Sequence, residues 1–426
     1  MSTYTIVNDA AGTTAATGAG NTSANQGHAS KRLLSLDAYR GLIMISLGFN
    51  GFGLAVTATK QLELNPESSF WETVRYQFSH VEWGGCAYWD LIQPSFMFMV
   101  GVSLAYSYAA REQRGESYGK MYMHAVTRSL VLIFLGIFLI SNWQDYTEWS
   151  LMNVLSQIGL GYTFLFLLWK RHWGIQLGAL LAILGGTWLA YTSYDGAGLD
   201  PTLGDPDRGV PTEWAQQYLH QANVPSAWHK NANVGHAVDL VVLNKLPRKE
   251  EFIFNGGGYQ TINFIPSLAT MLVGLMCGEL LRRDMSGMKK LIILVIVGGV
   301  CLEMGWFWDH VGGCPLVKRI WTPSWALFSS GWCCLLLAGF YGIIDVLGLR
   351  MWSFPLTVVG MNSIAMYCMG QLLKPWTAHS LKTHISQDLF LSLGEVYEPF
   401  VQATLVGLVF WLICFWMYKQ RIFVRI

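Results

Sequence analysis

The chain has 426 residues, of which 52% are hydrophobic and only 13% are charged, and its net charge is +1. Soluble globular proteins carry about 25% charged residues, so this composition excludes an ordinary water-covered surface and indicates a multi-pass membrane protein. The balanced charge also excludes nucleic acid as an evident partner, because binding a phosphate backbone requires a concentrated basic excess.

Residues 1–30 are rich in alanine, glycine, serine, threonine and asparagine, and they predict a disordered N-terminal tail ahead of a transmembrane domain at 31–426. Stretches of about 20 apolar residues predict ten membrane-spanning helices. These stretches lie near 34–57, 86–110, 121–141, 150–169, 173–191, 261–281, 289–307, 323–343, 353–373 and 399–418. The expected fold class is an all-α integral membrane protein.

The basic residues beside these stretches predict the orientation of the helices. With ten spans they all fall on one side of the membrane: Lys31, Arg32, Arg111, Arg114, Lys120, Lys170, Arg171, Arg282, Arg283, Lys289, Lys290, Arg350, Lys419, Arg421 and Arg425. We expect that side to be the cytoplasm and to hold both termini. The polar connection at 192–260 then lies on the extracytoplasmic side, and its length is unusual for a passive linker.

Polar side chains inside predicted spans are costly and are therefore candidate site residues. Asp37 and Arg40 stand three residues apart near the cytoplasmic end of the first span, where they can neutralise each other on one helix face. Arg40 could instead face an anionic donor that enters from the cytoplasm. The pair is thus open to a structural and to a functional interpretation.

A second group of polar residues lies toward the outer side. Asn50 follows Asp37 by about 20 Å along a helix, His80 comes just before the second span, and Asp90 lies about one turn inside it. A single outer histidine is more often interfacial than catalytic, but three polar groups at one depth favour a site. Histidine can act as a general base, and an amide can orient it or stabilise an oxyanion, which together suffice for acyl transfer.

Further candidates stand near the outer ends of later spans. Lys318 precedes the eighth span beside Trp321, and Tyr259 precedes the sixth. These side chains are suited to binding a sugar. Aromatic residues are also enriched at both membrane boundaries irrespective of any ligand, so this second interpretation stays open. Asn362 lies within the ninth span and is a further candidate.

Two features are typical of packing and not of chemistry. The eight cysteines lie mostly in apolar runs without paired CxxC spacing, so we expect buried thiols and no metal site. Gly274 and Gly278 have the small-xxx-small spacing with which membrane helices approach each other closely.

Six motifs in the chain are together similar to one enzyme family. They are KRLLSLDAYRGL, SHVEWGGCAYWDLIQPSFMFMVGVSLAYS, NVLSQIGLGY, YQTINFIPSLATMLVGLMCGE, LVKRIWTPSWAL and VVGMNSIAMY, in this order between residues 31 and 374. With them the chain resembles the heparan-alpha-glucosaminide N-acetyltransferase family and its bacterial relatives. The resemblance implies a multi-span enzyme that takes an acyl group from cytoplasmic acetyl-CoA and delivers it to a sugar across the membrane.

The resemblance also implies roles for individual residues. His80 matches the family's catalytic histidine and Asn50 its companion, while Asp90 and Asn362 match further polar positions. His80 would remove the acceptor's proton or transiently carry the acyl group. Asp90 would fix the imidazole tautomer, and Asn50 would position the histidine or the thioester carbonyl.

Two departures from the family pattern leave the acceptor open. Gln157 stands where relatives often carry an arginine, and the segment 255–258 (Asn-Gly-Gly-Gly) lacks the acidic residue usual before the sixth span. Both departures are expected in or near the acceptor-facing layer.

The sequence therefore predicts an acyltransferase of the bacterial cytoplasmic membrane. Its expected site residues are His80, Asn50 and Asp90 for catalysis, Arg40 and Asn362 for the donor, and Lys318, Trp321 and Tyr259 for the acceptor. The expected partners are acetyl-CoA, an extracytoplasmic glycan or amino sugar, and the lipid bilayer; a homo-oligomer stays open. The alternative is a transporter or flippase of a polar solute, which would also line a cavity with polar residues.

Overall fold

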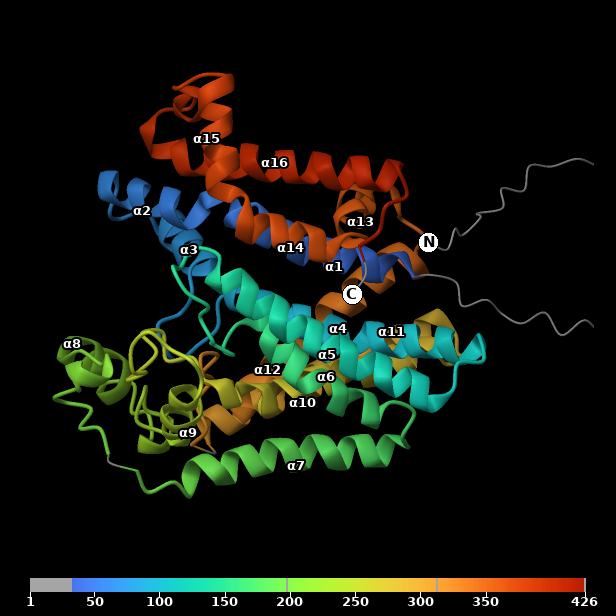
Figure 1. Ribbon diagram of the computed structural model, residues 1–426, viewed down its shortest axis with the longest axis horizontal. Coiled ribbons are helices and arrows are strands. Elements are labelled where there is room, and N and C mark those ends of the chain that lie inside the picture. The colour runs from blue at the N-terminus through green and yellow to red at the C-terminus, as the bar shows by residue number, and fades with distance from the viewer. Residues whose placement is uncertain (1–32, 197, 312, 425–426) are drawn as a thin grey trace, which may run out of the picture. The chain divides into compact units, whose positions relative to one another are not determined.

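The computed structural model describes residues 33–424 except 197 and 312, and over these residues the chain is helical without a β-strand (Figure 1). Two isolated bridges, Gly84 with Val317 and Asp205 with Val210, are the β-type pairings found in this part of the chain. The predicted all-α fold is confirmed. The predicted disordered tail at 1–30 lies outside the described residues.

Six helices are long and apolar enough to cross a membrane. They are α5 (Tyr118–Ser141), α7 (Trp173–Thr192), α10 (Phe264–Arg282), α11 (Gly287–His310), α12 (Pro323–Tyr341) and α16 (Glu398–Lys419). A bent pair, α1 (Leu34–Gly48) with the helical segment Asn50–Leu64, raises the number to seven if it forms one span. The protein is accordingly a multi-pass membrane protein, and each of these helices overlaps a predicted stretch.

The other three predicted spans are helical but are not confirmed as spans. They correspond to α4 (Ile92–Gln113), to α6 (Val154–Leu168), and to α13 (Phe354–Gly360) with α14 (Ser363–Leu372). Helix α4 carries many serines and tyrosines, and the 15 residues of α6 span about 22 Å, less than the roughly 30 Å of a hydrocarbon core. Helix α13 ends before Asn362, so the ninth stretch is two short helices.

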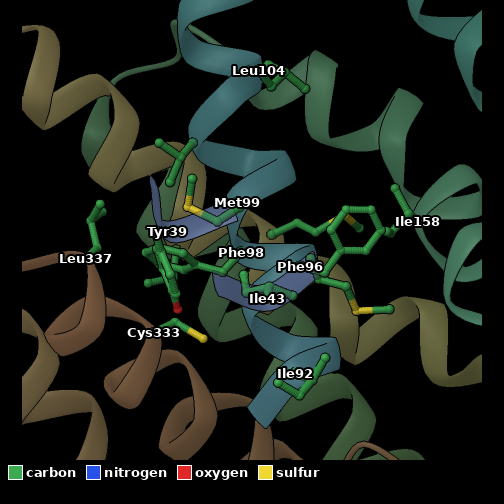
Figure 2. Packing of buried hydrophobic residues seen from close by; sticks show 14 of the residues in the cluster. Tyr39, Ile43, Ile92, Phe96, Phe98, Met99, Leu104, Ile158, Cys333 and Leu337 are labelled. Atoms are coloured by element: carbon green, nitrogen blue, oxygen red, sulfur yellow. The ribbon is translucent and has the colours of Figure 1, made fainter. Parts of the chain in front are cut away.

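The main core lies where α1, α4, α6, α10 and α12 meet. Figure 2 shows Tyr39 of α1 beside Cys333 of α12, with Phe98 and Met99 of α4 close by. The Tyr39 hydroxyl donates to Ser95 Oγ over 2.9 Å, so the buried phenol is satisfied within the core.

Glycines bring the central helices together. A Cβ on Gly274 of α10 would overlap the carbonyl oxygen of Phe98 in α4, and one on Gly278 would lie 2.7 Å from that of Val102. The packing interpretation of this glycine pair is therefore confirmed. Gly360 of α13 lies equally close to the Asp37 carbonyl of α1.

Several of the shorter helices gather in a layer at one end of the long helices, and we call it the outer layer because it covers that end. In Figure 1, α2 (Leu54–Leu64), α3 (Ser69–Phe78), α8 (Thr212–Ala215), α9 (Val234–Val242) and α15 (Lys374–His384) gather at the same end. The segment 192–260 is not a passive linker, since it contributes to a second core around Trp83, Tyr191, Trp228 and Val317. This layer holds the candidate site.

Candidate functional site

The loop between α3 and α4 is held in its conformation by hydrogen bonds to the carboxylate of Asp90. Asp90 lies in a short 3₁₀ turn (Tyr88–Leu91) that leads into α4, and its side chain is 1% exposed. Its Oδ2 accepts hydrogen bonds from the backbone N–H groups of Val81 and Ala87, over 3.2 and 3.3 Å. These bonds fold residues 81–90 back on themselves, and we call residues 79–91 the histidine loop.

His80 stands at the start of the histidine loop and contacts the same carboxylate. Its Nδ1 lies 2.7 Å from Asp90 Oδ1. An ionised carboxylate can only accept, so this contact places the proton on Nδ1 and leaves the Nε2 lone pair unused. With 40% of its side chain exposed, His80 can present that lone pair to a substrate.

Lys318 comes to this pair from a distant part of the chain. It lies in the segment 311–322 between α11 and α12, which we call the lysine loop, and Gly84 and Val317 form the bridge that joins the two loops. Lys318 Nζ lies 3.4 Å from Asp90 Oδ1 and 3.1 Å from His80 Nδ1. Burial lowers the pKa of Lys318 to about 8, with Asp90 opposing that shift.

Arg319, the next residue, connects the lysine loop to the histidine loop and to the segment before α10. It was not identified from the sequence. Its guanidinium donates to the carbonyl oxygens of Gly257, at 3.0 Å, and Val81, at 3.4 Å, and lies 5.8 Å from the ring centroid of Tyr259. A signal was available, because Lys318 and Arg319 form a basic pair on the side of the protein predicted to be poor in flanking basic residues.

A cavity of about 360 Å³ opens at His80. Its wall combines polar side chains with apolar ones, as is typical of a pocket that orients a small ligand. It is lined by Leu47, His80, Trp89, Ile92, Gln93, Phe96, Met152, Asn153, Val154, Asn255, Tyr259, Lys318, Tyr367 and Gln371. His80, Lys318 and Tyr259 are thus brought together, with Asp90 directly behind. The amides of Gln93, Asn153 and Gln371 were missed from sequence, where Gln93 and Gln371 were visible as polar breaks in apolar stretches.

The two departures from the family pattern have different surroundings. Asn255 lines the cavity, and its Oδ1 accepts from the N–H groups of Gly257 and Tyr259, each over 3.0 Å. Gln157 is 1% exposed, and its amide donates to the carbonyl oxygens of Leu151 and Thr261. Asn255 therefore shapes the site, whereas Gln157 joins α6 to the start of α10 and does not line the cavity.

Two predicted site residues lie outside the cavity lining. Asn50 is exposed, in a left-handed turn of four residues after α1, where Gly51 packs against Trp89. Trp321 is 1% exposed and its Nε1 donates to Thr270 over 3.3 Å. Trp321 is a core residue in this structure, because the turn that holds it directs the indole toward α10.

The predicted donor-side residues also lie away from the cavity. Arg40 of α1 forms an ion pair with Asp37 of the same helix at 3.3 Å, and it donates a hydrogen bond to Ser103 Oγ of α4 over 2.6 Å. The guanidinium therefore connects α1 with α4. Asn362 is fully buried, donates to the carbonyl oxygen of Ile422 and accepts from the N–H of Val424. Its amide thereby fastens the segment after α16 to the break between α13 and α14.

No group of three or more His, Cys, Asp or Glu side chains that could hold a metal ion occurs among residues 33–424, positions 197 and 312 aside. The charged and titratable groups that meet at the cavity are the imidazole of His80, the carboxylate of Asp90 and the ammonium of Lys318. Together these features define a multi-pass helical membrane protein with a histidine–carboxylate pair at a cavity in its outer layer.

Comparison with known proteins relates the chain to a group of enzymes. No family model matches the chain. It is 23% identical to the human heparan-alpha-glucosaminide N-acetyltransferase over 429 residues, and 23% identical to the mouse protein of that name over 428 residues. Each alignment covers 93% of this chain, and the chain spans 60% of the length of either relative. The chain is thus a distant relative of these N-acetyltransferases, as its motifs indicated.

Proposed function

We propose that the protein is an integral membrane acyltransferase that moves an acetyl group from acyl-CoA to an amino or hydroxyl group of an extracytoplasmic sugar. The observation that carries this proposal is the imidazole of His80, which Asp90 holds through Nδ1 at the mouth of the cavity. The names of the distant relatives supply the reaction class. In this proposal the protein belongs to a bacterial cytoplasmic membrane, as the motifs imply.

In the proposed reaction His80 is the general base. Its Nε2 takes the proton of the acceptor's amino or hydroxyl group as the acceptor atom bonds to the thioester carbonyl carbon. The carbon–sulfur bond then breaks, and the departing thiolate receives the proton from the imidazolium. Asp90 keeps the imidazole in the required tautomer through its contact with Nδ1. The balance requires no metal and no redox partner.

The cavity supports a small polar acceptor. The amide side chains of Gln93, Asn153, Asn255 and Gln371 offer donors and acceptors, and Tyr259 offers a flat face. Asn50 is retained in the proposal as the group that positions the histidine or the thioester carbonyl. Arg40 is retained as a contact for the donor's phosphates on the cytoplasmic side.

The test reconstitutes the protein in vesicles with labelled acetyl-CoA and a panel of amino sugars. We expect wild type to transfer label and His80→Ala to fall to the background, because general-base catalysis alone contributes about 10²–10⁴-fold. His384→Ala, an exposed histidine at the end of α15, is the matched control and is expected to retain full activity.

Three outcomes would count against this proposal. They are no transfer by wild type to any acceptor, equal transfer by His80→Ala, and uptake of the sugar without acyl-CoA, which a transporter would show. Mass spectrometry of protein incubated with labelled acetyl-CoA and no acceptor separates the two routes. Label on His80 would indicate an acyl-histidine intermediate, whereas its absence alongside transfer indicates direct attack.

A further inference from the structure

A buried ammonium beside a histidine base is an unusual arrangement. Lys318 is 4% exposed, and its Nζ is near both atoms of the His80–Asp90 contact, 3.1 Å from Nδ1 and 3.4 Å from Oδ1. Because Nδ1 carries the proton that it donates to Asp90, the ammonium cannot also donate to Nδ1. Lys318 therefore donates to the carboxylate and stands beside the ring as a positive charge.

Two effects follow from this charge. A positive group within about 4–6 Å disfavours a second positive charge, so the ammonium opposes protonation of the imidazole. The ammonium also neutralises Asp90, which would otherwise favour an imidazolium as its counter-ion. Both effects favour the neutral ring over the imidazolium, and only the neutral ring has the lone pair that removes a proton.

We propose that Lys318 is a positioning residue that acts as the counter-ion of Asp90 and thereby favours the neutral imidazole of His80 over the imidazolium, and that it does not bind the acceptor. This inference rests on the proposed function, since it assigns His80 the role of a base. The neighbouring charges agree with it. Arg319 donates to the carbonyl oxygens of Gly257 and Val81 and lies 3.8 Å from the carboxylate of Glu82. The further titratable groups near Asp90 and Lys318 are the thiol of Cys86 and the phenols of Tyr76 and Tyr259.

The architecture of the two loops supports a fixed position for the ammonium. Besides the bridge between Gly84 and Val317, the N–H of Gly85 donates to the carbonyl oxygen of Leu316 over 3.0 Å. The Lys318 side chain thus leaves the backbone one residue after the bridge at Val317 and two residues after the contact at Leu316. A lysine meant to follow a mobile sugar would not require this anchoring, and its head group would be more exposed.

The test measures the charge state of His80 without requiring activity. Diethyl pyrocarbonate modifies neutral imidazole, and peptide mass spectrometry gives the extent of modification at His80 as a function of pH. In Lys318→Met we expect the midpoint of this profile to move to higher pH by about one unit. Lys318→Arg, which keeps the charge, is expected to leave the midpoint near that of wild type.

The controls separate charge from folding. His384 is exposed in the same layer, and its profile is expected to be the same in every variant. Lys318→Gln is the second neutral variant, to be used if Lys318→Met does not fold, and the same shift is expected. An unchanged midpoint at His80 in a folded neutral variant would overturn the inference.

Kinetics give a second, independent reading. The acidic limb of the pH profile of kcat/KM is expected to move with the modification midpoint in Lys318→Met, at an unchanged KM for the acceptor. A raised KM with an unmoved limb would show that Lys318 binds the acceptor and would refute the inference. If wild type transfers no acetyl group the proposed function fails, while the modification midpoints still decide the role of Lys318.

Discussion

Asn50 combines an uncommon backbone conformation with an expected chemical role. Its φ is 50°, and the next three residues also have positive φ, so the chain turns sharply between α1 and α2. Asparagine and glycine adopt this region most readily, whereas alanine costs about 1 kcal/mol or more. An alanine substitution therefore confounds the backbone with the amide.

A pair of variants separates these two contributions. If the Asn50 amide takes part in the reaction, Asn50→Gly keeps the thermal midpoint of wild type but loses about 10²-fold in acetyl transfer, the usual effect of removing one stabilising donor. Asn50→Ala is expected to lower both the thermal midpoint and the rate. Retention of full activity by Asn50→Gly would show that Asn50 serves only the turn.

Individual site residues were predictable to different degrees. The closeness of His80 and Asp90 could be expected from sequence, because one stands just before the second predicted span and the other about one turn inside it. The approach of Lys318 could not, since it depends on a bridge between two loops. The burial of Trp321 was also hidden, because its φ of 48° turns the side chain away from the outer surface.

At the scale of elements, close contacts between helix backbones hold α1 in place. A Cβ on Gly360 of α13 would overlap the Asp37 carbonyl oxygen, and one on Gly41 of α1 would overlap that of Leu356. Neither obstacle is a flexible side chain, so the helices would have to separate. Gly360→Ala is expected to destabilise the protein by about 1–3 kcal/mol, which thermal denaturation in detergent measures.

Gly299 of α11 provides the matched control for that variant. A Cβ there meets no atom within 4 Å, so Gly299→Ala is expected to be neutral or stabilising by up to about 1 kcal/mol, as the helix propensities indicate. Equal thermal midpoints for the two variants would show that the contact between α1 and α13 does not limit stability.

The helices themselves were largely predictable, because long apolar stretches are a strong signal. Each of the ten predicted ranges contains a helix, yet three lack the length or hydropathy of a span. The break at Asn362 illustrates why. An asparagine within an apolar stretch shows that a polar partner is required, but not that the amide will hold the segment at 422–424.

At the scale of the whole molecule, the outer layer was the part least accessible from sequence. Residues 192–260 lack the regular hydrophobic period that identifies helices. They fold because Trp228 and neighbouring residues pack against Tyr191 at the end of α7 and Trp83 of the histidine loop, contacts between residues far apart in the chain. The proposed site is therefore assembled by the tertiary fold and not by one local motif.

Helix α11 has a further consequence for how the protein responds to its bilayer. Its 24 residues extend about 36 Å, and the largely apolar stretch between Lys290 and Asp309 accounts for about 27 Å of this length. That stretch is close to the roughly 30 Å of a hydrocarbon core, so α11 must tilt in a membrane that is thinner than the stretch. Gly298 and Gly305 hold it against α12, and the lysine loop joins these two helices at their outer ends. A thinner membrane would increase the tilt and strain the loop that carries Lys318. We expect the rate of acetyl transfer to fall as acyl chains shorten in a series of otherwise matched vesicles, and a rate independent of chain length would show that this mismatch does not reach the site.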